Sequence, residues 1–531
     1  MRFDQRFCAR AVVTAGLVAT IVSGFGLMPV HAQTTATTPP AQGPVRRMSI
    51  DDAVATAIEQ NLDLQVERFN PQIQEANSAQ FEANYAPIFT STVALVDQTQ
   101  PPSSFLSGNT NQITNGRSTF NFGLQQATPW YGGSYRIDFN NGRSTTNNIF
   151  STFDPQLTSN IQAVYTQPLL RNFKIDGTRQ QLLISQKNKE ISDVQLQQSV
   201  YGTVRNVRNA YYDLMYAIGN LNVQRQSLEL AQQSLKDNRA RVEIGTMAPL
   251  DIVQAEAEVA TREESVILAE AAIERAQDIL RALVFNPSSG PEFWTARIEP
   301  TEAVSFQQTA VDIDGAVRNA LGQRTDVVAA RKNLEVNDVN IRYFQNQSKP
   351  DLNASVTYNA QAIGGVALLR GRPAEGEIVG PVIATSERSY WDALGTTFAG
   401  DFPGWTVQFD LAYPLGKSPQ EAQLVRARLQ NTQAERQVQS LELQVTSQVR
   451  EYGRQVQTNG KRVDATRASR VLAERRLEAE EKKYQAGMTS SFFVLTAQRD
   501  LIVARNSELL ALVEYAKSVV NYTAVQQTPL F

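Results

Sequence analysis

Residues 405–414 read Trp-Thr-Val-Gln-Phe-Asp-Leu-Ala-Tyr-Pro, and a long segment without proline begins a few residues later. Apolar and polar side chains alternate along this stretch, which is the two-residue period of a strand with one apolar and one polar face. After Pro419 no proline occurs until Pro529. The charge-rich residues 420–486 therefore predict a helix that is roughly 100 Å long, at about 1.5 Å per residue.

The same alternation occurs in three further stretches. They are listed by their apolar positions: Leu352, Ala354, Val356 and Tyr358; Phe89, Val93 and Leu95; Ile161, Ala163 and Tyr165. Each stretch has about 10 residues, enough for a tilted strand to cross a bilayer. The aromatic residues Trp130, Trp391 and Trp405 lie in or beside these regions, and aromatic side chains at strand ends suit a membrane–water boundary. A soluble β-sandwich, which also alternates, is the alternative interpretation.

A second charge-rich segment without proline, residues 178–244, is as long as residues 420–486. Its apolar residues step by four and three from Val200 to Leu221, which is the a/d spacing of packed helices. Taken by itself, this segment is better explained by an ordinary coiled coil. The direct continuation from membrane-type strands favours a different role, in which the helices extend a wall that begins in the membrane.

Each long helix is predicted to end at a glycine turn, at Gly245 or Gly487, and to return as a shorter antiparallel helix. Glycine suits the end of a helix, and proline suits the beginning of the next. The return helices are predicted over residues 250–285 and 491–524. The two turns are therefore the hairpin tips, and they lie farthest from the strands.

The chain contains an internal duplication. Residues 48–54 align with residues 311–317 at an offset of 263, and farther along Gly245 aligns with Gly487 at an offset of 242. Self-similarity of this kind predicts two structural repeats. The predicted organisation is repeat 1 over 48–285, with membrane strands about 88–167 and a helical hairpin 178–285; a linker, 286–310; repeat 2 over 311–524, with membrane strands about 351–413 and a helical hairpin 420–524; and a C-terminal tail, 525–531.

Two strands in each repeat are the preferred count, which gives about four in each chain. Residues 120–127 and 135–140 also alternate around a short turn, and the polar stretch 142–156 follows them. Short turns at one end and long loops at the other are typical of outer-membrane strands. An extra hairpin in the first repeat, with six strands in each chain, is the alternative.

The N-terminus has the pattern of a secretory signal peptide over residues 1–32. Three arginines precede the uncharged segment 11–30, and Val30-His31-Ala32 places small residues at a cleavage site. Residues 33–47 are then a flexible N-terminal tail. A retained membrane anchor is the alternative.

Signal cleavage would remove Cys8 and His31, the only cysteine and the only histidine. Cysteine nucleophiles, His-dependent triads and Cys/His zinc sites are thereby excluded, so no cofactor or metal site is expected. Of 50 basic and 53 acidic residues, 47 and 52 would remain, a net charge of −5. This balance argues against a nucleic-acid partner. The many carboxylates single out no acid–base pair, and we predict that the protein is not an enzyme.

Four strands cannot close a barrel, and open sheet edges are not tolerated in lipid. Three copies related by cyclic symmetry would supply twelve strands, an even number in the bacterial range. We therefore predict an α+β membrane protein in which a trimeric outer-membrane β-barrel is continued by a long α-helical coiled-coil barrel.

The chain resembles the TolC-type outer-membrane factors over nearly all of residues 48–524. The resemblance rests on Tyr165–Leu170 and Tyr413–Gly416, which close the membrane segments, and on the two tips, Gly245…Asp251…Ala255 and Tyr484…Gly487…Ala497. It implies a homotrimer in the outer membrane of a Gram-negative-type bacterium, with its helical part in the periplasm, docked to a periplasmic adaptor and an inner-membrane transporter. The implied function is the passive exit duct of a tripartite efflux or type I secretion system. A trimeric adhesive stalk and a soluble periplasmic hydrolase are the alternatives.

The resemblance also implies an aperture at the tips, held by polar links and lined by acidic residues. Asp251 and Tyr484 match that pattern by position. Thr489 replaces a basic residue of the pattern, and Phe493 and Thr496 stand at its acidic positions. The ionic latch of the family is therefore not expected in its usual form.

We predict instead that Phe493, together with Phe492, forms an apolar constriction, while Asp251 provides carboxylates that favour cations. Packing of the two phenylalanines between helices is the alternative, as is an Asp251 placed only to complement the helix dipole. Adaptor docking is predicted at the tip residues Gly245, Thr246, Gly487 and Met488.

Overall fold

The computed structural model describes residues 44–102, 111–287, 293–303, 305–375, 379–416 and 418–527, and Pro44 onward forms one compact unit. The predicted signal peptide lies outside the described residues, as do residues 33–43 of the predicted N-terminal tail. Residues 288–292 and 304 of the predicted linker and residues 528–531 of the predicted C-terminal tail also lie outside them.

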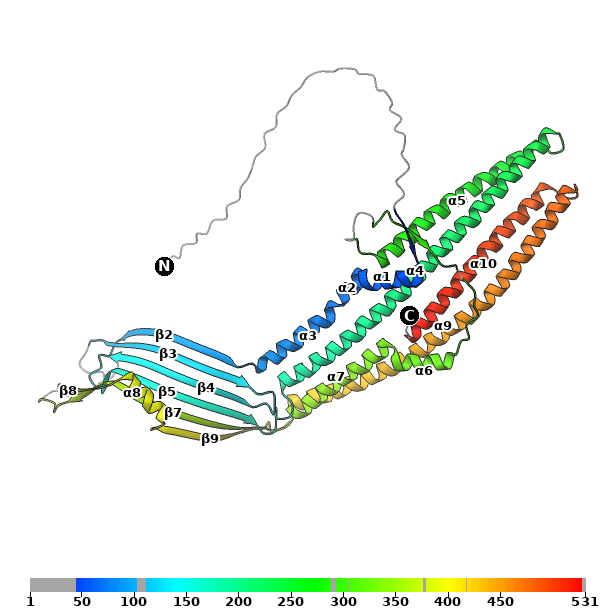
Figure 1. Ribbon diagram of the computed structural model, residues 1–531. Coiled ribbons are helices and arrows are strands. Elements are labelled where there is room, and N and C mark those ends of the chain that lie inside the picture. Colours follow the sequence, from blue (N-terminus) through cyan, green and yellow to red (C-terminus); the bar gives the residue numbers. More distant parts are fainter. Residues whose placement is uncertain are drawn as a thin grey trace, which may run out of the picture. The chain divides into compact units, whose positions relative to one another are not determined.

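Seven strands of the described chain form one antiparallel sheet (Figure 1). Their order is β2-β3-β4-β5-β7, and β8 and β9 both pair with β7, at residues 365–370 and 351–360 respectively. The sheet therefore has one edge at β2 and the other at β8 and β9. The strands are β2 Ile88–Gln100, β3 Ile113–Ala127, β4 Ser134–Thr146, β5 Phe153–Pro168, β7 Asp351–Arg370, β8 Val382–Arg388 and β9 Pro403–Ala412.

The predicted count of about four strands is wrong. The β3–β4 hairpin, which the sequence offered as the alternative, is present and pairs continuously from Asn115↔Thr146 to Ala127↔Ser134. Its turn is closed by Thr128 N–H donating to the Gly133 carbonyl at 2.7 Å. β7 is 20 residues long, so β8 and β9 share its outer side. The sheet is therefore six strand positions wide.

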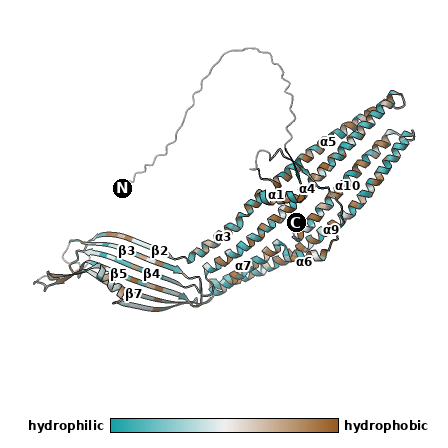
Figure 2. Ribbon diagram, viewed as in Figure 1, coloured by the Kyte–Doolittle hydropathy of each residue, from teal (hydrophilic) through white to brown (hydrophobic). Residues whose placement is uncertain are grey.

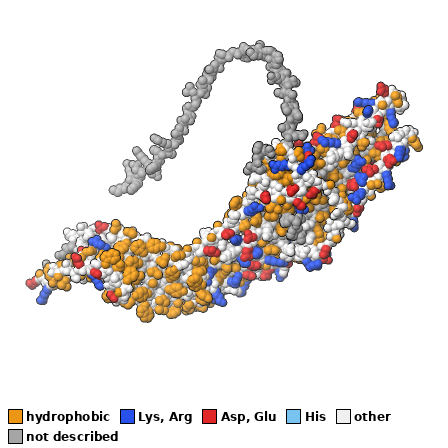
Figure 3. All heavy atoms as spheres, viewed as in Figure 1, with side chains coloured by type: hydrophobic (Ala, Val, Ile, Leu, Met, Phe, Trp, Pro, Cys, Tyr) orange, Lys and Arg blue, Asp and Glu red, His pale blue; other side chains and the backbone are white. Residues whose placement is uncertain are grey.

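The two faces of the sheet differ in polarity. One continuous row of paired residues crosses six strands and is apolar: Phe89, Leu124, Ile137, Ala163, Tyr358 and Trp405. The next row lies on the opposite face and is polar or small: Thr90, Gly123, Asp138, Gln162, Asn359 and Gly404. Hydropathy alternates along the strands in Figure 2, and hydrophobic side chains gather over the strands in Figure 3. The alternation that predicted the strands thus produces one apolar face.

The helices match the predicted hairpins. Their bounds are α1 Ile50–Gln60, α2 Leu62–Glu67, α3 Phe69–Glu82, α4 Gly177–Glu243, α5 Pro249–Val284, α6 Ile313–Gln323, α7 Thr325–Gln347, α8 Tyr390–Ala399, α9 Pro419–Gln485 and α10 Ser491–Gln526; a 3₁₀ turn spans Ala83–Tyr85. α4 and α9 each have 67 residues, and α5 and α10 each have 36. The starts of α4 and α9 differ by the predicted offset of 242.

Long helices of the two halves pack side by side in the order α3-α4-α7-α9. α5 returns along α4, α10 returns along α9, and α10 also contacts α4. A short parallel pair, β1 Val45–Met48 and β6 Arg297–Pro300, joins the N-terminal end of the described chain to the segment between the halves. Among the described residues, no helix has the length and apolarity needed to cross a bilayer.

The main apolar core forms where α1 and β6 pack against the α4–α5 hairpin. Val204, Val207 and Leu214 of α4 are almost fully buried there. Tyr211 is also fully buried, and its hydroxyl donates to the Met48 carbonyl at 2.9 Å. A smaller cluster under α6 joins α9 to α10. The a/d spacing predicted from Val200 to Leu221 is therefore the core stripe of α4.

Leu280 and Ile279 of α5 provide a matched test of this core. Leu280 is fully buried and Ile279 is 58% exposed. Leu280→Ala should destabilise the protein by about 2–5 kcal/mol because it leaves a cavity, whereas Ile279→Ala should cost less than about 0.5 kcal/mol. Thermal unfolding followed by helical circular dichroism in detergent measures both. Equal shifts for the two variants would contradict the assigned core.

Candidate aperture and docking site at the helical tips

The predicted site residues all lie at the tips of the two helical hairpins. α4 begins shortly after β5 and runs for 67 residues before its tip, and α9 does the same after β9. At about 1.5 Å per residue the tips lie roughly 100 Å along the helices from the sheet. The structure thus brings Asp251, Tyr484, Phe492 and Phe493 to the same end of the chain.

Each tip depends on one glycine in a left-handed conformation. Gly245 has φ +78° and Gly487 has φ +74°, a region that residues with a Cβ rarely adopt. The following amides complete the turns: Thr246 N–H donates to the Arg241 carbonyl, and Met488 N–H donates to the Lys483 carbonyl. The two glycines predicted from the sequence therefore end the long helices, within one residue of the expected positions.

Asp251 lies in the first turn of α5 and connects the two hairpins. The Ser491 hydroxyl at the start of α10 donates to Asp251 Oδ1 at 3.2 Å. Ser491 is buried. A carboxylate at this position also complements the positive end of the helix dipole, so Asp251 has both a structural setting and a link to the second tip.

Tyr484, in the last turn of α9, makes the other contacts between the tips. Its ring lies under the Arg241 guanidinium, with 4.4 Å from Cζ to the ring centroid. Its hydroxyl is 3.4 Å from Asn238 Oδ1 and 3.9 Å from Met247 Sδ. A cation over an aromatic face is worth about 0.5–1 kcal/mol at an exposed site. Sequence reasoning found Tyr484 but missed Arg241.

Phe492 and Phe493 begin α10 and are largely exposed in the single chain, at 60% and 52%. Their rings meet edge to face at 5.7 Å. Other exposed apolar side chains accompany them at the tips: Ile244, Leu250, Val253 and Met488. Within one chain the two phenylalanines therefore do not fill a helix interface.

A buried ionic cluster, missed from the sequence, ties the hairpins together two turns from the tips. Glu258 of α5 is 5% exposed and pairs with Arg499 of α10 and with Arg262. Arg262 Nε donates to Oε1 at 2.8 Å, and Arg499 Nε donates to Oε2 at 3.1 Å. The spacing in the sequence could have indicated this cluster. Glu258 follows Asp251 by seven residues, and Arg499 follows Ser491 by eight. Both side chains therefore lie about two turns along their own helices.

Burial raises the pKa of the Glu258 carboxyl, but hydrogen bonds and charge from Arg499 and Arg262 outweigh it and hold the pKa below its usual 4.5. A lowered folded-state pKa gives stability that is present above the unfolded pKa and lost as the pH falls through the folded pKa. The link between the hairpins should therefore weaken only below about pH 4.5.

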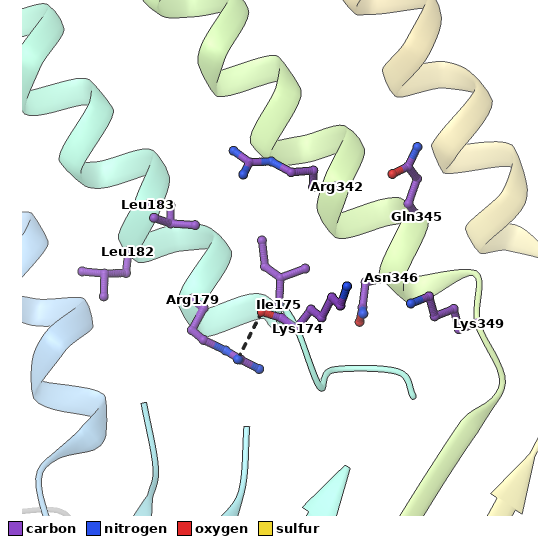
Figure 4. A pocket seen from close by; sticks show the side chains of 9 residues that line it. All are labelled: Lys174, Ile175, Arg179, Leu182, Leu183, Arg342, Gln345, Asn346 and Lys349. Carbon is purple, nitrogen blue, oxygen red and sulfur yellow. Dashed lines mark hydrogen bonds between the residues drawn. The ribbon is translucent and has the colours of Figure 1, made fainter. Parts of the chain in front are cut away.

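A cavity of about 570 Å³ lies at the other end of α4 (Figure 4). Ile175, Leu182 and Leu183 line it from the α4 side, and Arg342 and Lys349 come from the end of α7 and the residues after it. Its position beside the sheet separates it from the tips. Among the described residues no group of three or more acidic, His or Cys side chains is placed to hold a metal ion.

Glu258→Gln tests the ionic cluster. The wild-type protein should become more sensitive to protease at the tips as the pH falls from 5 to 3, because protonation of Glu258 removes its ion pairs. The variant should be more sensitive at pH 6 and show little further change with acid. Limited proteolysis across this pH range measures the effect.

Glu478→Gln is the matched control, since Glu478 pairs with Lys482 on an exposed face of α9. Its acid profile should follow that of the wild-type protein. An acid response that survives in Glu258→Gln would assign the effect to other carboxylates.

Known proteins resemble this chain along nearly its whole length. The sequence model of the family described as "Outer membrane efflux protein" matches residues 53–284 and 316–525. The outer membrane protein TolC of Vibrio cholerae is 23% identical over 175 residues, which are 33% of this chain and 39% of that protein. The sequence match thus spans well under two thirds of that relative.

Solved structures share the fold. The CmeC outer membrane channel of Campylobacter jejuni superposes with a TM-score of 0.63 at 14% identity, covering 90% of this chain and 85% of that one. The outer membrane protein VceC of Vibrio cholerae gives a TM-score of 0.61 at 16% identity, covering 90% and 95%. The predicted TolC-type resemblance is confirmed, and so is the outer-membrane location. With more than three quarters of its residues matched by the family, the chain belongs to the outer membrane efflux proteins.

Proposed function

We propose that three copies of this chain form one continuous duct, which passively conducts substrate from a periplasmic pump assembly through the outer membrane. The single observation that carries the proposal is the sheet of one chain. It has one apolar face, one polar face and two open edges, and long helices continue from the strands.

The open edges support closure between copies. In lipid no water is available to satisfy unpaired backbone groups, so an exposed sheet edge is very costly. β2 runs toward the end of the sheet that is remote from the long helices, and β9 runs back toward those helices. β2 of one copy can therefore pair antiparallel with β9 of the next, and cyclic symmetry repeats that contact until the ring closes.

The width of the sheet sets the width of the duct. Three copies of six strand positions give eighteen, in place of the twelve expected from four strands in each chain. Barrels of 16–18 strands leave a water-filled channel. The polar face, with Asp138, Gln162 and Asn359 in one row, lines that channel. The apolar face contacts outer-membrane lipid.

The hairpin tips are the proposed docking surface for a periplasmic adaptor that joins the duct to an inner-membrane transporter. Gly245, Thr246, Gly487 and Met488 form the turns, and Met488 is 78% exposed. Exposed apolar side chains that are surrounded by a rim of polar residues are typical of protein-binding surfaces. A purely adhesive stalk needs no return helices, whereas α5 and α10 return from both tips.

The same tips form the proposed aperture. Three copies bring Phe492 and Phe493 around one axis, where exposed apolar rings narrow the duct and resist wetting. Asp251, which accepts a hydrogen bond from Ser491 at the start of the same helix as the phenylalanines, contributes one carboxylate from each copy, and the three together favour cations. Tyr484 holds the second tip against the first through Arg241. Transport is downhill through this opening, so the chain itself needs no catalytic group.

Phe493→Ser should increase single-channel conductance severalfold, because a hydroxyl wets a constriction that a phenyl ring keeps dry. Planar bilayers with the purified full chain measure it.

Asp251→Asn should reduce the preference for cations, which is read from the reversal potential in a salt gradient.

Val503→Ser is the control for conductance, since Val503 is an exposed residue of the same helix beyond the tip. It should conduct like the wild-type protein. Unchanged conductance in Phe493→Ser would overturn the apolar constriction, and the absence of any channel from the wild-type protein would overturn the duct.

A further inference from the structure

Helix α8, Tyr390–Ala399, lies on the apolar face of the sheet. Phe120 of β3 meets Tyr390 edge to face at 5.8 Å, and Phe139 of β4 lies 5.9 Å from Phe398. The Tyr390 hydroxyl donates to Asn141 Oδ1 at 2.9 Å. Phe120, Phe139 and Asn141 share one face through the cross-strand pairs of β3 and β4, and it is the face that carries Phe89 and Trp405.

The sheet is shaped to receive this helix. Along the apolar face of β7, large side chains give way to small ones where α8 crosses, at Ala360, Ala362 and Gly364. Ala360 and Ala362 are 1% and 4% exposed. A Cβ on Gly364 would lie 3.1 Å from the Cβ of Ala393, so only glycine fits easily there.

The side of α8 that packs on the sheet carries small side chains, and its buried hydroxyl group is hydrogen-bonded. Ala393 and Thr397 are almost fully buried. The Thr397 hydroxyl bonds the carbonyls of Ala393 and Ser159, at 3.0 and 3.4 Å. The ends are also fixed: Ser389 and Asp392 form a capping box, and Gly400 ends the helix with φ +69°. α8 is therefore a docked element of the fold.

The outer side of α8 is aromatic and nearly free of charge. Trp391 is 75% exposed and Phe398 is 66% exposed. Asp392, the one carboxylate in a helix that has no basic residue, is engaged at the N-terminal cap. The outer side of α8 thus continues the apolar surface that the helix covers, instead of presenting polar groups to water.

The partner of this surface follows from its position. α8 packs mainly over β5 and β7 and reaches β4 through Tyr390. β4 and β5 are inner strands, and β7 lies inside β8 and β9 except at residues 361–364, which pair only with β5. Chains that pair through β2 and β9 meet at the edges and leave these strands uncovered. The chain resides in the outer membrane. Beside α8 the same face is apolar on the side of the long helices, at Phe122, Phe139 and Ile161, while Ser118 and Arg143 lie on the side remote from them. We propose that α8 lies inside the lipid phase, with Trp391 and Phe398 packed against acyl chains.

Three single-tryptophan proteins test this proposal. Each keeps one tryptophan, Trp391, Trp405 or Trp294, and carries phenylalanine at the other three tryptophan positions. The full chain is reconstituted into phosphatidylcholine vesicles with brominated acyl chains, which quench nearby indoles. Trp391 should be quenched to within about twofold of Trp405. Trp294, which is exposed in the segment before β6, should be unaffected.

Quenching of Trp405 but not of Trp391 would overturn the proposal. If Trp391 in that case is also protected from quenching by iodide in water, protein covers α8. If neither tryptophan is quenched, the apolar face does not contact lipid and the proposal falls with it. In the protein that keeps only Trp391, the double change Trp391→Phe, Phe398→Trp moves the single indole to the other end of α8. It should give the same quenching. Circular dichroism confirms that each variant is folded.

Discussion

The backbone groups along the outer sides of β2 and β9 have no strand partner within the described chain. In water such edges are a liability, and in lipid each unpaired N–H or C=O costs several kcal/mol. The apolar face makes lipid the natural surroundings of this sheet. No single solvent therefore suits both the open edges and the two faces of an isolated chain. Pairing between copies resolves the conflict.

The helices follow from the same constraint. β5 and β9 each lead into a 67-residue helix, so a closed ring of strands would be followed by a ring of helices. The two hairpins are held together near their tips by the Ser491–Asp251 hydrogen bond, the Arg241–Tyr484 stack and the buried Glu258 cluster. These links lie within one chain, so each copy can deliver a preformed double tip to the assembly.

Much of this fold can be predicted from the sequence because two periods dominate it. The two-residue period located β7 and β9, and the glycine and proline positions placed both long helices within one residue of their observed ends. The strand count failed in the first repeat. β3 and β4 also alternate, but the second repeat shows only two clear strands and argued for the same number in the first. The full length of β7 is hard to predict for another reason: Ala360, Ala362 and Gly364 carry little apolar signal where α8 covers the strand.

The remaining differences concern contacts between distant residues. Trp391 was interpreted as an aromatic residue at a strand end, but it lies on α8, and a ten-residue helix has too few turns to stand out by periodicity. In the sequence nothing distinguishes Glu258 from the many other charged residues of the long helices. Its partner Arg499 lies 241 residues away, and only the packing of the hairpins shows that the pair is buried.

Native mass spectrometry of the protein, extracted in mild detergent and kept at its natural concentration in the membrane extract, tests the central claim most directly. Joined edges in a closed ring predict one dominant species at three times the mass of the single chain, with no higher multiples. A dominant single chain that retains its sheet by infrared spectroscopy would contradict the account, because the edges would then be satisfied without a second copy.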